Sequence, residues 1–116
     1  LEAKDGILVG RITGPDPYIV RPNMRIPAAA CKTVVIRMSS TAGQMGQLFW
    51  ATERSPAFDE EKSVRFPIEP DGQVHEYRLN VGDHPQWKGQ IIVALRLDPG
   101  GGTPEGQFQV DSIRAE

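Results

Sequence analysis

The chain has 116 residues, with 13 Lys and Arg against 15 Asp and Glu, a formal net charge of -2, and 39% hydrophobic residues. This length is enough for one domain with a two-layer core, and the hydrophobic content is too high for a disordered segment and too scattered for a membrane span. No block of Lys and Arg occurs, which disfavours nucleic-acid binding. We therefore predict a single monomeric domain, residues 1–116, that neither binds nucleic acid nor inserts into a membrane.

The distribution of Gly and Pro points to an all-β fold. The chain contains 12 Gly and 10 Pro spread evenly along it, which leaves no room for a long helix. Between the turn signals, of which Pro70-Asp71-Gly72 is the strongest, β-branched and alternating apolar residues predict short strands. The predicted strands are Ile7–Thr13, Tyr18–Val20, Thr33–Met38, Gln47–Thr52, Ser63–Ile68, His75–Asn80, Gln90–Leu97 and Gln107–Ile113. Strands at this spacing are typical of a sandwich or barrel.

The late strand carries the clearest alternation. Its predicted core stripe is Ile91, Val93, Leu95 and Leu97, which repeat at every second position. Arg96 then falls on the opposite face. In the strand 47–52 both faces carry an aromatic residue, so its orientation stays open.

Arginines on non-core faces suggest a ligand surface. Arg37, Arg78 and Arg96 all fall on such faces, and they would lie together if their three strands share one sheet. With Glu76 and an aromatic ring from Phe49 or Trp50, they would form a carbohydrate-binding face, since sugars stack on aromatic rings and pair their hydroxyls with charged groups. Of the two tryptophans, Trp50 is the better ligand candidate and Trp87 is expected to be structural. The alternative is that the arginines are ion-paired and only stiffen the sheet.

Little in the sequence supports an enzyme. His75 and His84 are the only histidines, no serine lies in a nucleophile-elbow pattern, and the acidic run 59–61 is expected to be a solvated loop. Cys31 is the only cysteine, which excludes an intrachain disulfide and favours a small buried side chain. We predict a non-catalytic domain.

Several motifs resemble a known family in their order and spacing. They are Asp5-Gly6-x-Leu8, Thr13-Gly14-x-Asp16-Pro17, the VVIRM and QLFWAT strands, Asp71-Gly72 with His75-x-Tyr77, Trp87-x-Gly89, Leu95-Arg96-Leu97-Asp98-Pro99 and Val110-Asp111-x-Ile113. Together they resemble carbohydrate-binding-module-like jelly rolls of the galactose-binding-like superfamily, which are accessory domains of secreted polysaccharide-degrading enzymes. The resemblance implies an all-β jelly-roll β-sandwich of about eight to ten short antiparallel strands.

The same resemblance implies a role and partners. The domain would bind a polysaccharide or oligosaccharide, sit in one chain with a glycoside hydrolase or lyase catalytic domain, and be secreted or displayed on the cell surface, whether extracellular or periplasmic. We expect it to be one module of a larger multidomain protein. Three guanidinium groups on one face favour sulfated or uronic-acid polymers as first ligands to try. The rival hypothesis is a structural β-sandwich that packs against a catalytic domain without binding sugar.

The resemblance also implies a structural calcium ion. Asp111 matches the late aspartate of the family pattern, and Asp5 is a possible early partner. Calcium needs about six to eight oxygen ligands. The glutamate-containing first strand of the family pattern is missing here or lies upstream of Leu1, so only these two ligands are predicted.

Overall fold

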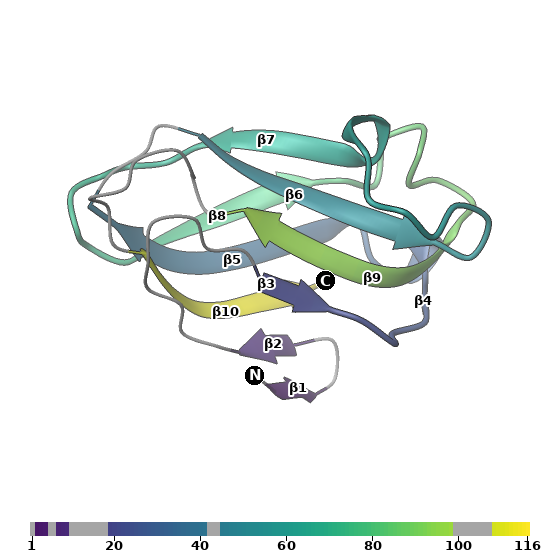
Figure 1. Ribbon diagram of the computed structural model, residues 1–116, viewed down its shortest axis with the longest axis horizontal. Coiled ribbons are helices and arrows are strands. Elements are labelled where there is room, and N and C mark those ends of the chain that lie inside the picture. The colour runs from purple at the N-terminus through teal and green to yellow at the C-terminus, as the bar shows by residue number, and fades with distance from the viewer. Residues whose placement is uncertain (1, 5–6, 10–18, 42–44, 99–107) are drawn as a thin grey trace.

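The chain folds into two antiparallel sheets packed face to face, as the computed structural model in Figure 1 shows. The structure describes residues 2–4, 7–9, 19–41, 45–98 and 108–116. Within these residues, helical structure is confined to two 3₁₀ turns, η1 (Ala28–Ala30) and η2 (Glu60–Lys62), and no helix has the length and apolar character needed to cross a membrane. The prediction of an all-β sandwich is confirmed, whereas the jelly-roll connectivity stays a prediction.

The first sheet has the order β1-β2-β10-β5-β8. Its strands are β1 (Glu2–Lys4), β2 (Ile7–Val9), β10 (Phe108–Ala115), β5 (Thr33–Ser40) and β8 (His75–Asn80). The second sheet has the order β3-β9-β6-β7, with β4 also paired to β9. Its strands are β3 (Ile19–Arg21), β9 (Ile91–Asp98), β6 (Met45–Thr52), β7 (Ser63–Pro67) and β4 (Ile26–Pro27).

Each strand predicted from the sequence is found, and two short strands were missed. The predicted strand Ile7–Thr13 is seen as β2 up to Val9, and its remainder lies outside the described residues, as does Tyr18 at the start of the next prediction. The missed strands are β1 and β4, which have three and two residues. Segments this short carry no measurable alternation, so only their pairing with β2 and β9 reveals them.

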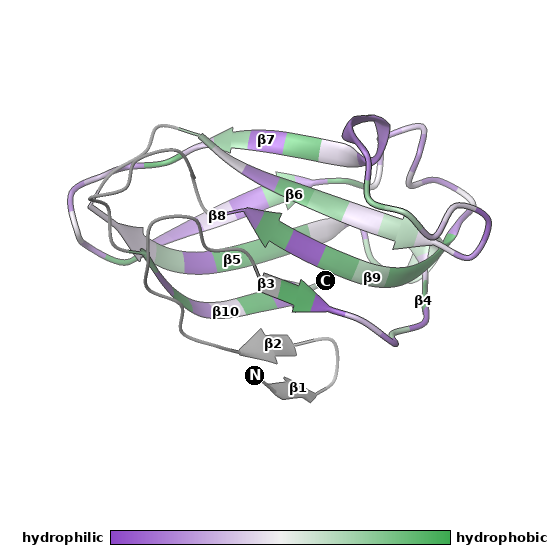
Figure 2. Cartoon of the chain, in the orientation of Figure 1, coloured by the Kyte–Doolittle hydropathy of each residue, from purple (hydrophilic) through white to green (hydrophobic). Residues whose placement is uncertain are grey.

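The core lies between the sheets and is made by alternate residues of the central strands. Val34, Ile36 and Met38 of β5 face Leu48 and Trp50 of β6 across it, and all five are fully buried. The open orientation of the strand 47–52 is thereby decided, because Leu48 and Trp50 point inward and Phe49 lies on the outer face. Figure 2 shows the resulting alternation of apolar and polar residues along the central strands.

The predicted core stripe of the late strand is correct at one end and wrong at the other. Leu95 and Leu97 are buried as predicted, but Ile92 lies in the core at 0% exposure, while Ile91 and Val93 are only half-buried. The cause is a β-bulge. Ala51 pairs with Ala94 whereas Thr52 pairs with Ile92, so one extra residue of β9 sits between them and reverses the alternation.

A buried lysine holds the loop between β6 and β7. The side chain of Lys62 is 4% exposed, and its Nζ donates to Asp59 Oδ2 at 2.9 Å and to Ser55 Oγ at 2.6 Å. The Asp59 side chain also caps η2 by accepting from the Lys62 backbone N–H. The hydrogen bond from the Lys62 side chain holds the pKa of Asp59 below its usual value of 3.8.

We expect acid to destabilise the fold through this pair. A carboxyl group whose pKa is lower in the folded than in the unfolded chain contributes stability above its unfolded value, here 3.8 for Asp59. That contribution is lost as the pH falls below 3.8 through the folded pKa, when the Lys62 ammonium loses its counterion. Thermal unfolding followed from pH 6 to pH 2.5 measures this. An Asp59→Asn variant should already be less stable at pH 6 and should lose less on acidification, whereas a Glu69→Gln control should follow the unaltered protein.

Candidate functional site

The structure divides the predicted carbohydrate-binding face among three places. Arg37, Arg78 and Glu76 lie on the outer face of the first sheet, where Arg37 is directly opposite Glu76 in the register of β5 and β8. Arg96 and Phe49 are cross-strand neighbours on the outer face of the second sheet. The expectation of one sheet for all three arginines is therefore wrong for Arg96, because β9 pairs with β6 and β3 rather than with β5.

Trp50 cannot serve as the stacking residue that the sequence suggested. Its side chain is 0% exposed and lies between the sheets, 4.8 Å from the His84 ring and 5.2 Å from the Trp87 ring in edge-to-face geometry. Its Nε1–H donates to the Gln86 carbonyl at 3.1 Å. Trp50 is therefore a core residue that anchors the loop after β8, and it offers no ring face to a ligand.

Phe49 and Arg96 form a pair of their own. The Arg96 guanidinium lies 5.3 Å from the centre of the Phe49 ring, and its Nε donates to Asp98 at 2.8 Å. Only 8% of Phe49 is exposed, so the ring has little area left for a sugar. This arrangement fits the alternative of a paired, sheet-stiffening arginine better than it fits a ligand contact.

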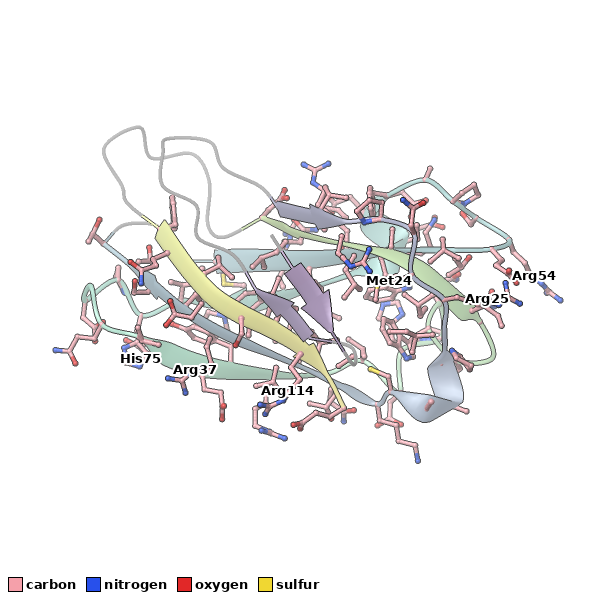
Figure 3. The ribbon with its side chains drawn as sticks, turned by 90° about the horizontal axis from the view of Figure 1, so that it is seen from below. Met24, Arg25, Arg37, Arg54, His75 and Arg114 are labelled. Carbon is pink, nitrogen blue, oxygen red and sulfur yellow. The ribbon has the colours of Figure 1, made fainter. Side chains whose placement is uncertain are left out.

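On the outer face of the first sheet, three arginines lie together. We call Arg37, Arg78 and Arg114 the arginine face; Figure 3 shows Arg37 and Arg114 projecting from the same side of the molecule. Arg78 and Arg114 each contact the Glu116 carboxylate at 2.7 Å, and Arg78 also lies 3.7 Å from Glu76. The Arg78 hydrogen bond, with the charges of both arginines, lowers the pKa of Glu116. Arg37 is exposed, and no ion pair to it is seen among the described residues.

A polar pocket lies at one end of the sandwich. It has a volume of about 500 Å³ and lies between the segment that leads into β5 and the loop that follows β8. We call it the end pocket. Its lining residues are Ala28, Ala29, Lys32, Asn80, Gly82, Asp83, Trp87, Lys88 and Gly89.

Backbone contacts hold the two walls of the end pocket together. The Gly82 N–H donates to the Lys32 carbonyl at 2.9 Å, the Trp87 indole N–H to the Cys31 carbonyl at 2.9 Å, and the Ala28 N–H to the Gln90 carbonyl at 2.9 Å. A Cβ atom at Gly82 would lie 2.9 Å from Lys32 Cβ and 3.1 Å from its Cα, so only glycine allows this close approach. The pocket is therefore built into the fold and does not depend on a ligand.

The chemistry of the end pocket is that of polar recognition. The exposed side chains are Lys32, Asn80, Asp83 and Lys88, which supply two ammonium groups, an amide and a carboxylate. Asn80 Nδ2 lies 3.4 Å from Asp83 Oδ2, so the amide and the carboxylate sit side by side. The Trp87 ring is 2% exposed, which agrees with its predicted structural role and leaves no platform for stacking.

Sequence reasoning missed the end pocket. Its residues come from two segments about fifty positions apart, and each looks like an ordinary polar loop when read alone. The turn Gly82-Asp83 next to Asn80 is the only local signal, since glycine, aspartate and asparagine are also the usual residues of turns. Cys31, next to the pocket, is buried as expected, and burial raises the pKa of its thiol.

Of the two predicted calcium ligands, the structure describes only Asp111. Asp111 accepts a hydrogen bond from the Gln109 side chain at 3.1 Å, and Asp5 lies outside the described residues. No group of three or more His, Cys, Asp or Glu residues within the described ranges could hold a metal ion. Because calcium takes about six to eight oxygen ligands and Asp5 is not described, the calcium site stays a prediction.

Comparison with known proteins leaves the function to be argued from this geometry. No protein-family model matches the sequence, and no curated protein matches it. The end pocket and the arginine face are therefore the two features from which we infer a function.

Proposed function

We propose that this domain is a non-catalytic carbohydrate-binding module and that the end pocket is its primary sugar site. The observation that carries the proposal is a preformed pocket of about 500 Å³ lined by an amide, a carboxylate and two ammonium groups. Small-molecule sites in proteins commonly enclose about 300–1,000 Å³. The end pocket is of that size, and its lining is polar enough for a ligand that is rich in hydroxyl groups.

The polar groups of the end pocket suit sugar hydroxyls in particular. A hydroxyl donates one hydrogen bond and accepts others, so it is best held between an acceptor and a donor. Asp83 accepts, Lys32 and Lys88 donate, and the Asn80 amide does both. Because the surrounding loop is held by backbone hydrogen bonds, little backbone conformational entropy is lost when a ligand binds.

As a module, the domain would act by proximity. Attached to a glycoside hydrolase or lyase in a secreted or surface-displayed protein, it would hold that enzyme near its polysaccharide and so raise the effective concentration. The resemblance in sequence motifs to jelly-roll carbohydrate-binding modules supports this context, and the β-sandwich agrees with it. The rival role, a structural sandwich that packs on a catalytic domain, is favoured only by the paired Phe49 and Arg96 on the second sheet.

Removing a polar group from the end pocket tests the proposal. We expect the unaltered domain to be retarded in affinity gels that contain at least one polysaccharide. Asn80→Ala should weaken that binding by about tenfold or more. The variant loses a hydrogen bond to a bound hydroxyl group, and Asp83 loses its hydrogen bond from the Asn80 amide. The matched control is Gln73→Ala, which removes an exposed amide from the loop before β8, at the opposite end of that strand.

Both variants should unfold at the same temperature as the unaltered protein, because both side chains are exposed. Retention that is equal for Asn80→Ala and Gln73→Ala would exclude the end pocket as the sugar site. A domain that is retarded by no polysaccharide, but that binds its own catalytic domain, would support the structural role.

A further inference from the structure

Two ammonium groups line the end pocket. Lys32 and Lys88 are exposed at its rim, and across the residues that the structure describes neither forms an ion pair. Among the described residues, Asp83 is the only carboxylate that lines the pocket, and its partner there is the Asn80 amide. A neutral sugar would supply neither ammonium group with an anionic partner, whereas a carboxylate or sulfate group would supply one.

The end pocket continues directly into the arginine face. Asn80, which lines the pocket, lies on β8 two residues from Arg78, and residues at this spacing share one face of a strand. One step further along that face, Glu76 lies opposite Arg37 of β5. The pocket and the arginine face thus form one continuous polar surface along the edge of the first sheet.

Two carboxylates on this surface, Glu76 and Glu116, already form ion pairs with arginines. Glu116 is held by Arg78 and Arg114 at 2.7 Å each, and Glu76 lies 3.7 Å from Arg78. Arg37, in contrast, is exposed and forms no ion pair with any of the described residues, and a guanidinium group can make a bidentate contact with an external anion. Lys32, Lys88 and Arg37 place three positive charges on this surface, although the whole chain carries a net charge of -2.

We propose that the ligand is an acidic polysaccharide, whose first carboxylate or sulfate group is bound by Lys32 and Lys88 in the end pocket and whose chain runs along β8 to a second acidic group on Arg37. This inference rests on the proposed carbohydrate-binding function and names its substrate class. Glu76, which lies opposite Arg37, is four positions before Asn80 on β8, which corresponds to about 13 Å at the rise of an antiparallel strand. A single sugar cannot span this distance, so binding should strengthen with chain length.

The experiment compares acidic polymers with their neutral counterparts. Polygalacturonate and a sulfated galactan are offered to the domain beside the same polymers after carboxyl reduction or desulfation, and oligosaccharides of one to eight units are titrated by calorimetry. We expect at least one acidic polymer to bind at least tenfold more tightly than its neutral form, the long oligomers to bind more tightly than the short ones, and the affinity to fall as salt is raised.

Single-residue variants distinguish the contribution of the end pocket to binding from that of the arginine face. Lys32→Ala and Lys88→Ala should each weaken binding of short and long acidic oligomers by about fivefold to tenfold, since each removes one ionic contact. Arg37→Ala should weaken only the long oligomers. The matched control is Arg65→Ala, because Arg65 is also an exposed strand arginine, 62% exposed, but belongs to β7 of the other sheet.

Each other outcome overturns a defined part of the proposal. Equal binding of acidic and neutral polymers, lost in Asn80→Ala but not in Lys32→Ala, would overturn the acidic ligand and leave the carbohydrate-binding function standing. Equal losses for Arg37→Ala and Arg65→Ala would overturn the path along the first sheet. If single-stranded DNA bound as tightly as the polysaccharide, the specificity for carbohydrate would be overturned, because the surface would then attract any polyanion. Failure to bind any glycan would overturn both this inference and the function on which it rests.

Discussion

Replacing Trp50 by alanine is expected to lower the free energy of unfolding by about 3–5 kcal/mol, the usual cost of removing a fully buried large aromatic side chain. The indole is 0% exposed and packs edge-to-face against Trp87 at 5.2 Å. Its loss would leave a cavity between the sheets and would free the Gln86 carbonyl, which now accepts from the Trp50 Nε1–H at 3.1 Å. Urea unfolding followed by circular dichroism measures the change.

Two further variants serve as comparisons for the loss of stability in Trp50→Ala. Trp50→Phe keeps much of the ring volume but cannot donate to Gln86, so it should cost less than Trp50→Ala. Met45→Ala, at a side chain that is 49% exposed, should leave stability nearly unchanged. A Trp50→Ala protein that unfolds like the unaltered one while losing its retention on polysaccharide would return Trp50 to the ligand surface and contradict its placement in the core.

Leu95→Ala should destabilise the domain by about 2–5 kcal/mol, because it opens a cavity at the centre of the sandwich. Leu95 is 4% exposed and lies directly opposite Trp50 in the register of β9 and β6. The β-bulge adds a sharper comparison within the same strand. Ile92→Ala should cost nearly as much as Leu95→Ala, since Ile92 is 0% exposed, whereas Val93→Ala should cost much less.

Chemical denaturation of these three variants tests the bulge directly. Without it, a regular alternation would place Val93 in the core together with Leu95 and would expose Ile92. A larger loss of stability for Val93→Ala than for Ile92→Ala would therefore show that β9 is regular. Val74→Ala, at a side chain that is 41% exposed, serves as the control for an apolar truncation outside the core.

The long strands were predictable because they carry their signal locally. The β-branched centre of β5 and the turn signal Pro70-Asp71-Gly72 are properties of neighbouring residues; β5 is present, and the chain bends at residues 71–73, where Gly72 has a φ of 76°. It was harder to predict which face of a strand points into the core. In β6 an aromatic residue falls on each face, and only the pairing with β9 shows that Trp50 lies inside while Phe49 lies under Arg96 on the outside.

The candidate site was much less predictable than the fold. Arg37 and Arg78 were recognised as non-core residues, and strand pairing does place them on one face. Arg96 was grouped with them because alternation tells which residues leave the core but not which of two sheets a strand joins. The end pocket was missed because Lys32 and Asp83 come from segments that meet only after β5 and β8 have paired.

By itself, then, the sequence determined the all-β class, the positions of the long strands, the burial of Leu95 and Cys31, and the structural role of Trp87. It could do so because burial and strand propensity depend on alternation and turn residues within a few positions. Tertiary structure alone decided the bulge at Val93, the burial of Trp50, the separation of Arg96 from Arg37 and Arg78, and the end pocket. Each of these depends on which strands become neighbours, and pairing is set by contacts between residues far apart in the chain, which no local pattern records.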